Sequence, residues 1–90
     1  MPRPQKRRRI CALPRVRHFA PSDVSVCGVV AMTIDEYETI RLMDLLGCTQ
    51  EECAAQMGVA RTTVQAVYGT ARRKLAEALV KGKQLEIGGG

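Results

Sequence analysis

A short run of side chains in the second half of the chain has the residue types and spacing of a surface that reads DNA bases. The run follows a glycine-containing turn at residues 58–60 and consists of Arg61, Thr62, Gln65 and Ala66. Residues four positions apart share one side of a helix. Arginine, threonine and glutamine can hydrogen-bond to base edges in the major groove, and an alanine methyl can contact thymine. We therefore predict that these four residues contact bases.

Basic side chains around this set suit phosphate oxygens, which Lys, Arg and helix N-termini commonly contact in complexes with DNA. Within the same predicted helix they are Arg72, Arg73 and Lys74, one to two turns further on. Near the start of the chain, the predicted phosphate contacts are Lys6, Arg7, Arg8 and Arg9.

Charge is segregated along the 90-residue chain, whose net charge is +5. Residues 1–32 carry seven basic side chains against one acid, residues 33–58 carry six acids against one base, and residues 59–90 carry six bases against two acids. A polyanion would be attracted to both ends and repelled by the middle. Ordinary solvated faces are the plainer alternative for such a charge pattern.

Composition indicates one small domain with an aliphatic core, because the chain has only three aromatic residues and no Trp. The longest apolar run, Val26–Met32, is too short to span a bilayer, and the N-terminus lacks the apolar region of a signal peptide. Without an extracellular context, the four cysteines do not indicate a disulfide framework. We expect a reduced, cytoplasmic protein that does not associate with membranes.

Two capping boxes predict where helices begin. Thr33-x-x-Glu36 and Thr49-x-x-Glu52 each place a hydroxyl acceptor and a carboxylate at a helix start. We expect helices from 33 to about 46, from 49 to 58, and from 61 to about 81. The glycines that should end them are Gly47, Gly58 and Gly82.

Two short apolar stretches read as strands, one at 29–32 and a possible partner at 84–87, where polar and apolar residues alternate. The three prolines before residue 15 oppose helix formation in the first segment. The sequence therefore predicts a mostly α fold. It comprises a basic extended N-terminal arm over residues 1–24, a tri-helical helix-turn-helix domain over residues 25–90, and a possible short two-stranded β pair.

Apolar residues that recur at helical spacing predict the buried faces. In the first helix they are Ile34, Tyr37, Ile40, Leu42, Leu45 and Leu46. In the third helix they are Val64, Val67, Tyr68, Ala71, Leu75, Ala78 and Leu79. Cys48 and Cys53 flank the second capping box, where they should pack together as a hydrophobic staple. A redox switch between these two cysteines is the alternative.

Several of these motifs together resemble region four of bacterial sigma factors, which recognises the promoter −35 element. The matching stretches are Thr33-x-x-Glu36-x-Glu38-x-Ile40-Arg41-Leu42, Gly47-x-Thr49-x-Glu51-Glu52-x-Ala54, Met57-Gly58-Val59-x-Arg61-x-x-Val64 and Ala71-Arg72-Arg73-Lys74-Leu75.

The whole chain also resembles a small prokaryotic family of predicted DNA-binding proteins that open with a basic arm of the MPRP type and close with a Gly-Lys-x-Leu-x-Ile-x-Gly-Gly tail. The resemblance implies transcriptional regulation.

The sigma-like pattern also implies roles for individual residues. It places Arg61, Thr62, Gln65 and Ala66 where base-contacting residues would lie, and Thr49 and Gln50 where a phosphate would be held. One departure is Ala60, which replaces the serine usual at this N-cap and leaves backbone donors free.

The leading hypothesis is a DNA-binding transcriptional regulator that acts on double-stranded DNA as a homodimer, because dimers that read two half-sites are common. One alternative is a module that docks on RNA polymerase through its acidic first two helices. A metal or redox sensor would use Cys11, His18 and Cys27, but spacings of seven and nine match no compact zinc pattern, and we predict no metal or other cofactor. No catalytic constellation accompanies the single histidine, so we predict no enzymatic activity.

Overall fold

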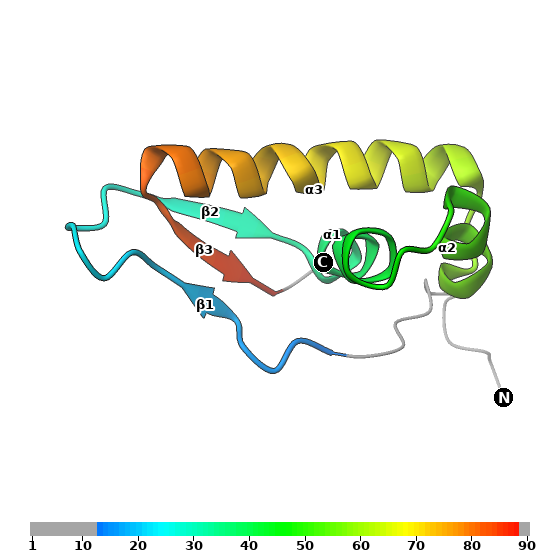
Figure 1. The fold of residues 1–90 in the computed structure, drawn as a ribbon, viewed down its shortest axis with the longest axis horizontal. Coiled ribbons are helices and arrows are strands. Elements are labelled where there is room, and N and C mark those ends of the chain that lie inside the picture. Colours follow the sequence, from blue (N-terminus) through cyan, green and yellow to red (C-terminus); the bar gives the residue numbers. More distant parts are fainter. Residues whose placement is uncertain (1–12, 89–90) are drawn as a thin grey trace, which may run out of the picture.

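The computed structural model describes residues 13–88, so the predicted phosphate contacts Lys6–Arg9, as well as Cys11, lie outside the described residues. Within this range a long helix runs over a small sheet at one end and over two shorter helical segments at the other (Figure 1). In chain order the elements are β1 (His18–Phe19), β2 (Val29–Met32), α1 (Ile34–Thr39), the π-helix η1 (Ile40–Leu45), α2 (Gln50–Met57), α3 (Arg61–Lys81) and β3 (Gln84–Ile87). The prediction of a mostly α fold with three helices is confirmed.

The sheet has three strands in the order β1-β3-β2 rather than the two that were predicted. β2 and β3 pair in parallel, with Val30 opposite Leu85 and Met32 opposite Ile87. β1 lies antiparallel on the other side of β3, with His18 opposite Glu86. The sequence prediction missed β1 because two residues are too few to show an alternating pattern.

The first helix starts as predicted but changes its hydrogen-bond pattern midway. Thr33 and Glu36 form the predicted capping box: the Glu36 amide donates to Thr33 Oγ1 at 3.1 Å, and the Thr33 amide donates to Glu36 Oε1 at 2.8 Å. The α-helix gives way at Ile40 to π geometry, in which the Leu46 amide donates to the Arg41 carbonyl at 3.0 Å. Hydrogen bonds across five residues widen the turn. The three- and four-residue spacing therefore no longer decides which side chains face the core.

α2 and α3 are joined by the predicted turn. Thr49 and Glu52 form the second capping box, and Gly58 ends α2 with a φ of 71°, in the left-handed region that favours glycine. α3 follows for 21 residues, a length of about 31 Å. None of the helices in the range 13–88 has the length and apolar character that a membrane span requires.

Two separate clusters of buried side chains stabilise the two ends of α3. The turn end comprises η1, α2, the 58–60 turn and residues 61–70, and its buried residues are Leu42, Cys53, Ala54, Met57 and Val64. The sheet end comprises the three strands and residues 71–81, and its buried residues are Val30, Met32, Ala71, Leu85 and Ile87. α3 therefore contributes one fully buried residue to each cluster.

Three of the predicted core residues are exposed. Leu45 and Leu46 lie at the end of the π-helix, where the widened turn directs them outward, with Leu45 76% exposed. Leu79 is 83% exposed, although the preceding residue, Ala78, packs on the sheet-end cluster. The predicted staple at Cys48 and Cys53 is confirmed, since Cys53 is buried and Cys48 packs on the same cluster.

Candidate nucleic-acid interface

The four predicted base contacts lie together on one exposed face at the start of α3. Arg61, Thr62, Gln65 and Ala66 are all exposed, whereas Val64 between them is buried against α2 and η1. The burial of Val64 fixes the rotation of the helix, and that rotation directs the polar residues to solvent. The structure thus brings these four side chains to a single continuous surface.

An ion pair connects this face to the start of α2. Arg61 Nη1 lies 3.6 Å from Glu51 Oε2, and both side chains are largely exposed. The pair joins the first turn of α2, where Thr49 and Gln50 lie, to the first residue of α3. The Thr49 hydroxyl already accepts the Glu52 amide at 3.1 Å, so its capping role is filled within α2.

No side chain caps the start of α3. Ala60 is the N-cap residue and makes no side-chain hydrogen bond, as its small methyl side chain requires. The first amide groups of a helix have no partner within the helix, and they give this end a partial positive charge. The amide donors of the first turn therefore lie at the end of α3 that also carries Arg61 and Thr62.

The three basic residues predicted to contact phosphate occupy different environments. Arg72 and Arg73 are exposed on the same side of α3 as the predicted base contacts. Lys74 points the other way, with its Nζ 2.8 Å from Glu36 Oε1 in the first turn of α1. Glu36 is buried, so this contact supplies a counter-charge to a carboxylate that is shielded from water.

Sequence reasoning did not include a network that links η1 to the exposed face of α3. The Tyr68 hydroxyl donates to Asp44 Oδ1 at 2.5 Å, and Arg72 Nε lies 3.7 Å from Asp44 Oδ2. The Arg72 guanidinium also lies 5.4 Å from the centre of the Tyr68 ring. The hydrogen bond to Asp44, with smaller effects of burial and of the Asp44 charge, raises the pKa of Tyr68. Asp44 and Tyr68 are 24 residues apart, and no local pattern indicates that they meet.

Gly69 lies in the middle of this face, and no neighbouring part of the fold requires a residue without a side chain there. It is exposed, and a Cβ placed on it would meet no atom within 4 Å. Glycine in a helix costs roughly 0.5–1 kcal/mol relative to alanine. The fold alone would therefore favour alanine at this position.

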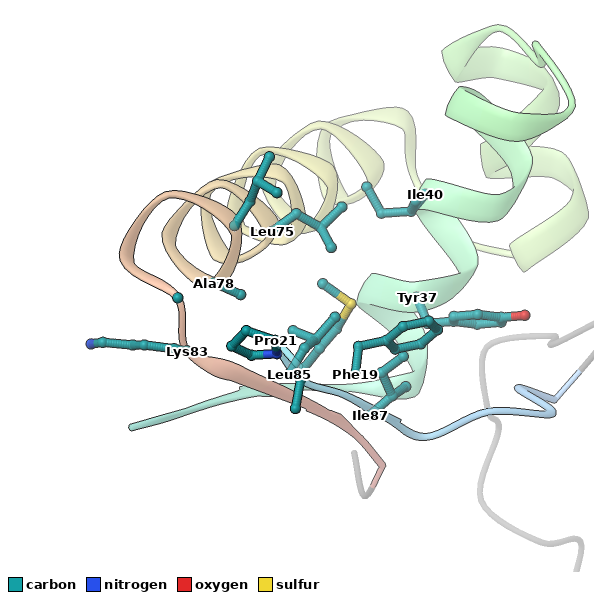
Figure 2. A pocket seen from close by; sticks show the side chains of 13 residues that line it. Phe19, Pro21, Tyr37, Ile40, Leu75, Ala78, Lys83, Leu85 and Ile87 are labelled. Carbon is teal, nitrogen blue, oxygen red and sulfur yellow. The ribbon is translucent and has the colours of Figure 1, made fainter. Parts of the chain in front are cut away.

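A hollow of about 460 Å³ opens at the sheet end. Figure 2 shows Leu75, Ala78 and Ile40 on one side of it, facing Leu85 and Ile87 on the sheet, while the Lys83 amine points away. Phe19 and Pro21 close it from the segment around β1. Leu79 of α3 is also among its lining residues. Sequence reasoning missed this hollow, because its lining comes from four separate parts of the chain.

His18 and Cys27, the described members of the set considered for a metal or redox sensor, contact different partners. His18 is on β1, with its Nδ1 3.3 Å from Gln84 Nε2, and the Cys27 thiol donates to the Lys81 carbonyl at 3.4 Å. Among residues 13–88, no group of three His, Cys, Asp or Glu side chains could hold a metal ion. Burial, with smaller contributions from Cys48 and Glu38, raises the pKa of the Cys53 thiol, which disfavours the reactive thiolate.

Comparisons with known proteins place the chain in a family. A family model described as "Protein of unknown function DUF134" matches residues 1–90. A UPF0251 protein of Desulfitobacterium hafniense is 60% identical over 92 residues, which cover all of this chain and 74% of the relative. UPF0251 proteins of Halothermothrix orenii and Dehalococcoides mccartyi are 47% and 45% identical over 92 residues, covering all of this chain and 68% and 79% of those relatives. No solved structure matches the chain. From the match over its whole length, the chain belongs to the DUF134 family, together with these UPF0251 proteins.

Proposed function

We propose that this protein is a transcriptional regulator that binds double-stranded DNA through the exposed face at the start of α3. The observation that supports this most directly is the grouping of Arg61, Thr62 and Gln65 on one exposed surface, on the helix that follows the turn. A helix in this position of a helix-turn-helix enters the major groove with its N-terminal residues toward the bases. Ala66 completes the surface with a methyl group that suits thymine.

Electrostatics support the same proposal. The uncapped start of α3 presents amide donors and a partial positive charge next to Arg61, and both favour a phosphate. Arg72 and Arg73 add two positive charges further along the same exposed side. Thr49 and Gln50 lie at the start of α2, which the Arg61–Glu51 ion pair connects to this surface.

The test begins with selection of duplexes from a random DNA pool, followed by binding measurements on the selected duplex by fluorescence anisotropy at several salt concentrations. We expect the logarithm of affinity to fall linearly with the logarithm of salt concentration, by about 0.9 per phosphate that is neutralised. Arg61→Ala should weaken binding by roughly 5- to 150-fold, which corresponds to about 1–3 kcal/mol.

Lys81→Ala is the matched control, because Lys81 is an exposed base at the other end of the same helix. It removes the same charge and should change affinity much less than Arg61→Ala. Equal losses from the two variants would show that binding depends on net charge rather than on this face. Retention of RNA polymerase with no duplex binding would assign the protein to the polymerase-docking class instead.

We further propose that the protein acts as a homodimer that meets through the sheet end. Leu79, which borders the apolar hollow, and Val80, the next residue of α3, are 83% and 80% exposed. One surface therefore holds both a recess and an exposed apolar pair, and such a patch can be complementary to itself across a two-fold axis between identical chains. A second copy would place its leucine and valine on the apolar lining and remove both from water.

Sedimentation analysis of the Leu79→Lys variant tests this assembly. The variant should be monomeric at concentrations where the wild type is a dimer. Leu45→Lys is the control, because Leu45 is equally apolar and 76% exposed but lies at the turn end. A wild type that remains monomeric, or a Leu79→Lys variant that still dimerises, would reject the interface.

A further inference from the structure

We infer that Asp44 and Tyr68 position Arg72 to receive a DNA phosphate beside Gly69. This inference rests on the proposed DNA binding and names two residues that would act through a third. Arg72 would contact the phosphate, whereas Asp44 and Tyr68 would hold the guanidinium in place before DNA arrives.

Tyr68 is held by its own helix, α3, and by a hydrogen bond to the π-helix η1. It lies on α3 one residue before Gly69, and its hydroxyl donates at 2.5 Å to Asp44 at the end of the π-helix. A hydrogen bond from a hydroxyl to a carboxylate is charge-assisted, and this distance is at the short end of its usual range. The tyrosine ring is therefore held between two elements that pack on the same core.

Arg72 makes two contacts with this pair and remains exposed. Its guanidinium lies 5.4 Å from the Tyr68 ring centre, within the range of a cation–π interaction. Its Nε lies 3.7 Å from Asp44, while the Arg72 side chain is 63% exposed. An arginine that is already oriented loses less conformational freedom on binding than one that moves freely in solvent.

Gly69 leaves space for a sugar-phosphate backbone to come close to α3. Gly69 and Arg72 are three residues apart, so they are neighbours on the helix surface. The surface at Gly69 has no Cβ, and apart from its two chain neighbours no described side chain lies within 4 Å of where that atom would be. A sugar-phosphate backbone could therefore approach the helix closely at the point where the Arg72 guanidinium is fixed.

The test is a double-mutant cycle with Tyr68→Phe and Arg72→Ala, measured on the selected duplex. Tyr68→Phe removes the hydroxyl that contacts Asp44 without changing the net charge. It should weaken binding about 3- to 10-fold in the wild-type background and have no further effect once Arg72 is alanine. The salt slope should fall by up to about 0.9 in Tyr68→Phe and in Arg72→Ala, and by no more in the double variant.

Ser25→Ala is the control for loss of a side-chain hydroxyl, since Ser25 is exposed between β1 and β2 and lies away from the start of α3. It should leave affinity and salt slope unchanged, and thermal unfolding should show that every variant is folded. Equal effects of Tyr68→Phe with and without Arg72 would overturn the positioning role while leaving DNA binding intact. A folded wild type that binds no selected duplex would overturn the proposed function and this inference together.

Discussion

The two ends of α3 present different surfaces although they belong to one continuous helix. At the turn end the exposed side is polar and basic, with Arg61, Thr62 and Gln65, whereas at the sheet end it is apolar, with Leu79 and Val80. Each end also has its own buried cluster. The difference matches the two proposed roles of the helix, a polar surface for DNA and an apolar surface for a second chain.

Ion pairs follow the same division. On the side proposed to face DNA, Arg61 and Arg72 lie 3.6 and 3.7 Å from their acids, and all four side chains are at least one-third exposed. Nearer the sheet, Lys74 lies 2.8 Å from Glu36 and Lys83 lies 2.7 Å from Glu77. Long, exposed pairs contribute little to stability. Arg61 can therefore exchange Glu51 for a phosphate at small cost. In the proposed complex Arg72 keeps Asp44 as an orienting partner, whereas the two lysines serve the fold.

The largest expected effect concerns the buried cluster of the turn end. Leu42→Ala should lower the free energy of unfolding by about 2–5 kcal/mol, because Leu42 is completely buried and its removal leaves a cavity. Leu45→Ala, three residues away and exposed, should change it by less than about 0.5 kcal/mol. Urea denaturation of both variants checks the pair. Similar losses of stability in the two variants would mean that Leu42 is not buried and Leu45 not exposed as the π-helix places them.

Changes at the N-caps of α2 and α3 should have smaller effects on stability, and of opposite sign. Thr49→Ala should destabilise the protein by about 1 kcal/mol, because the Glu52 amide loses its acceptor. Ala60→Ser should stabilise it by a similar amount, since it adds the acceptor that α3 lacks. If free amide donors at α3 help to hold phosphate, Ala60→Ser should also weaken duplex binding. Thermal unfolding and anisotropy measure the two effects separately, and a stabilised variant with unchanged affinity would remove that role.

Gly69→Ala should raise the free energy of unfolding by roughly 0.5–1 kcal/mol and weaken duplex binding. The stability rises because alanine favours the helix and meets no neighbour, and affinity falls because a methyl group occupies the surface that DNA approaches. Gly82→Ala is the control at the sheet end, where a φ of 67° makes alanine strained and destabilising. A Gly69→Ala variant that is more stable and binds DNA as before would show that no close approach occurs there.

The smallest effect concerns the surface pair of the sheet end. The hydrogen bond from Lys83 lowers the pKa of Glu77, and the same bond raises the pKa of Lys83. A lowered acid pKa stabilises the fold above the unfolded-state value of about 4.5, and that stability is lost as pH falls through the folded-state value. The raised lysine pKa stabilises the fold below about 10.5, and that part is lost as pH rises through the folded-state value. Glu77 and Lys83 are half-buried at the surface, where solvent still screens the pair, so the contribution is small.

Glu77→Gln removes both parts of this dependence. Its melting temperature should therefore fall less than that of the wild type on moving from neutral to acidic pH, and less on moving to strongly alkaline pH. Parallel melting curves for the two proteins across both ranges would show that the pair does not stabilise the fold.

Local signals in the sequence were enough for the helices and for the exposed face. The capping boxes at Thr33 and Thr49 located two helix starts, because their hydrogen bonds connect residues only three apart. The burial of Val64 and Ala71 followed from their spacing along one helix. The same spacing failed at Leu45 and Leu46, where π geometry changes the number of residues per turn, and at Leu79, where the fold provides no cover.

The sequence by itself therefore determined which segments are helical and where they begin and end. It also determined which residues of α3 form its polar face. Only the tertiary structure decided that Lys74 turns inward to Glu36, that Asp44 meets Tyr68 and Arg72, and that the apolar hollow forms beside Leu79. The physical reason is the distance along the chain between the interacting residues. A helix start depends on neighbours within one turn, whereas these contacts join residues from elements that come together only when the two clusters pack.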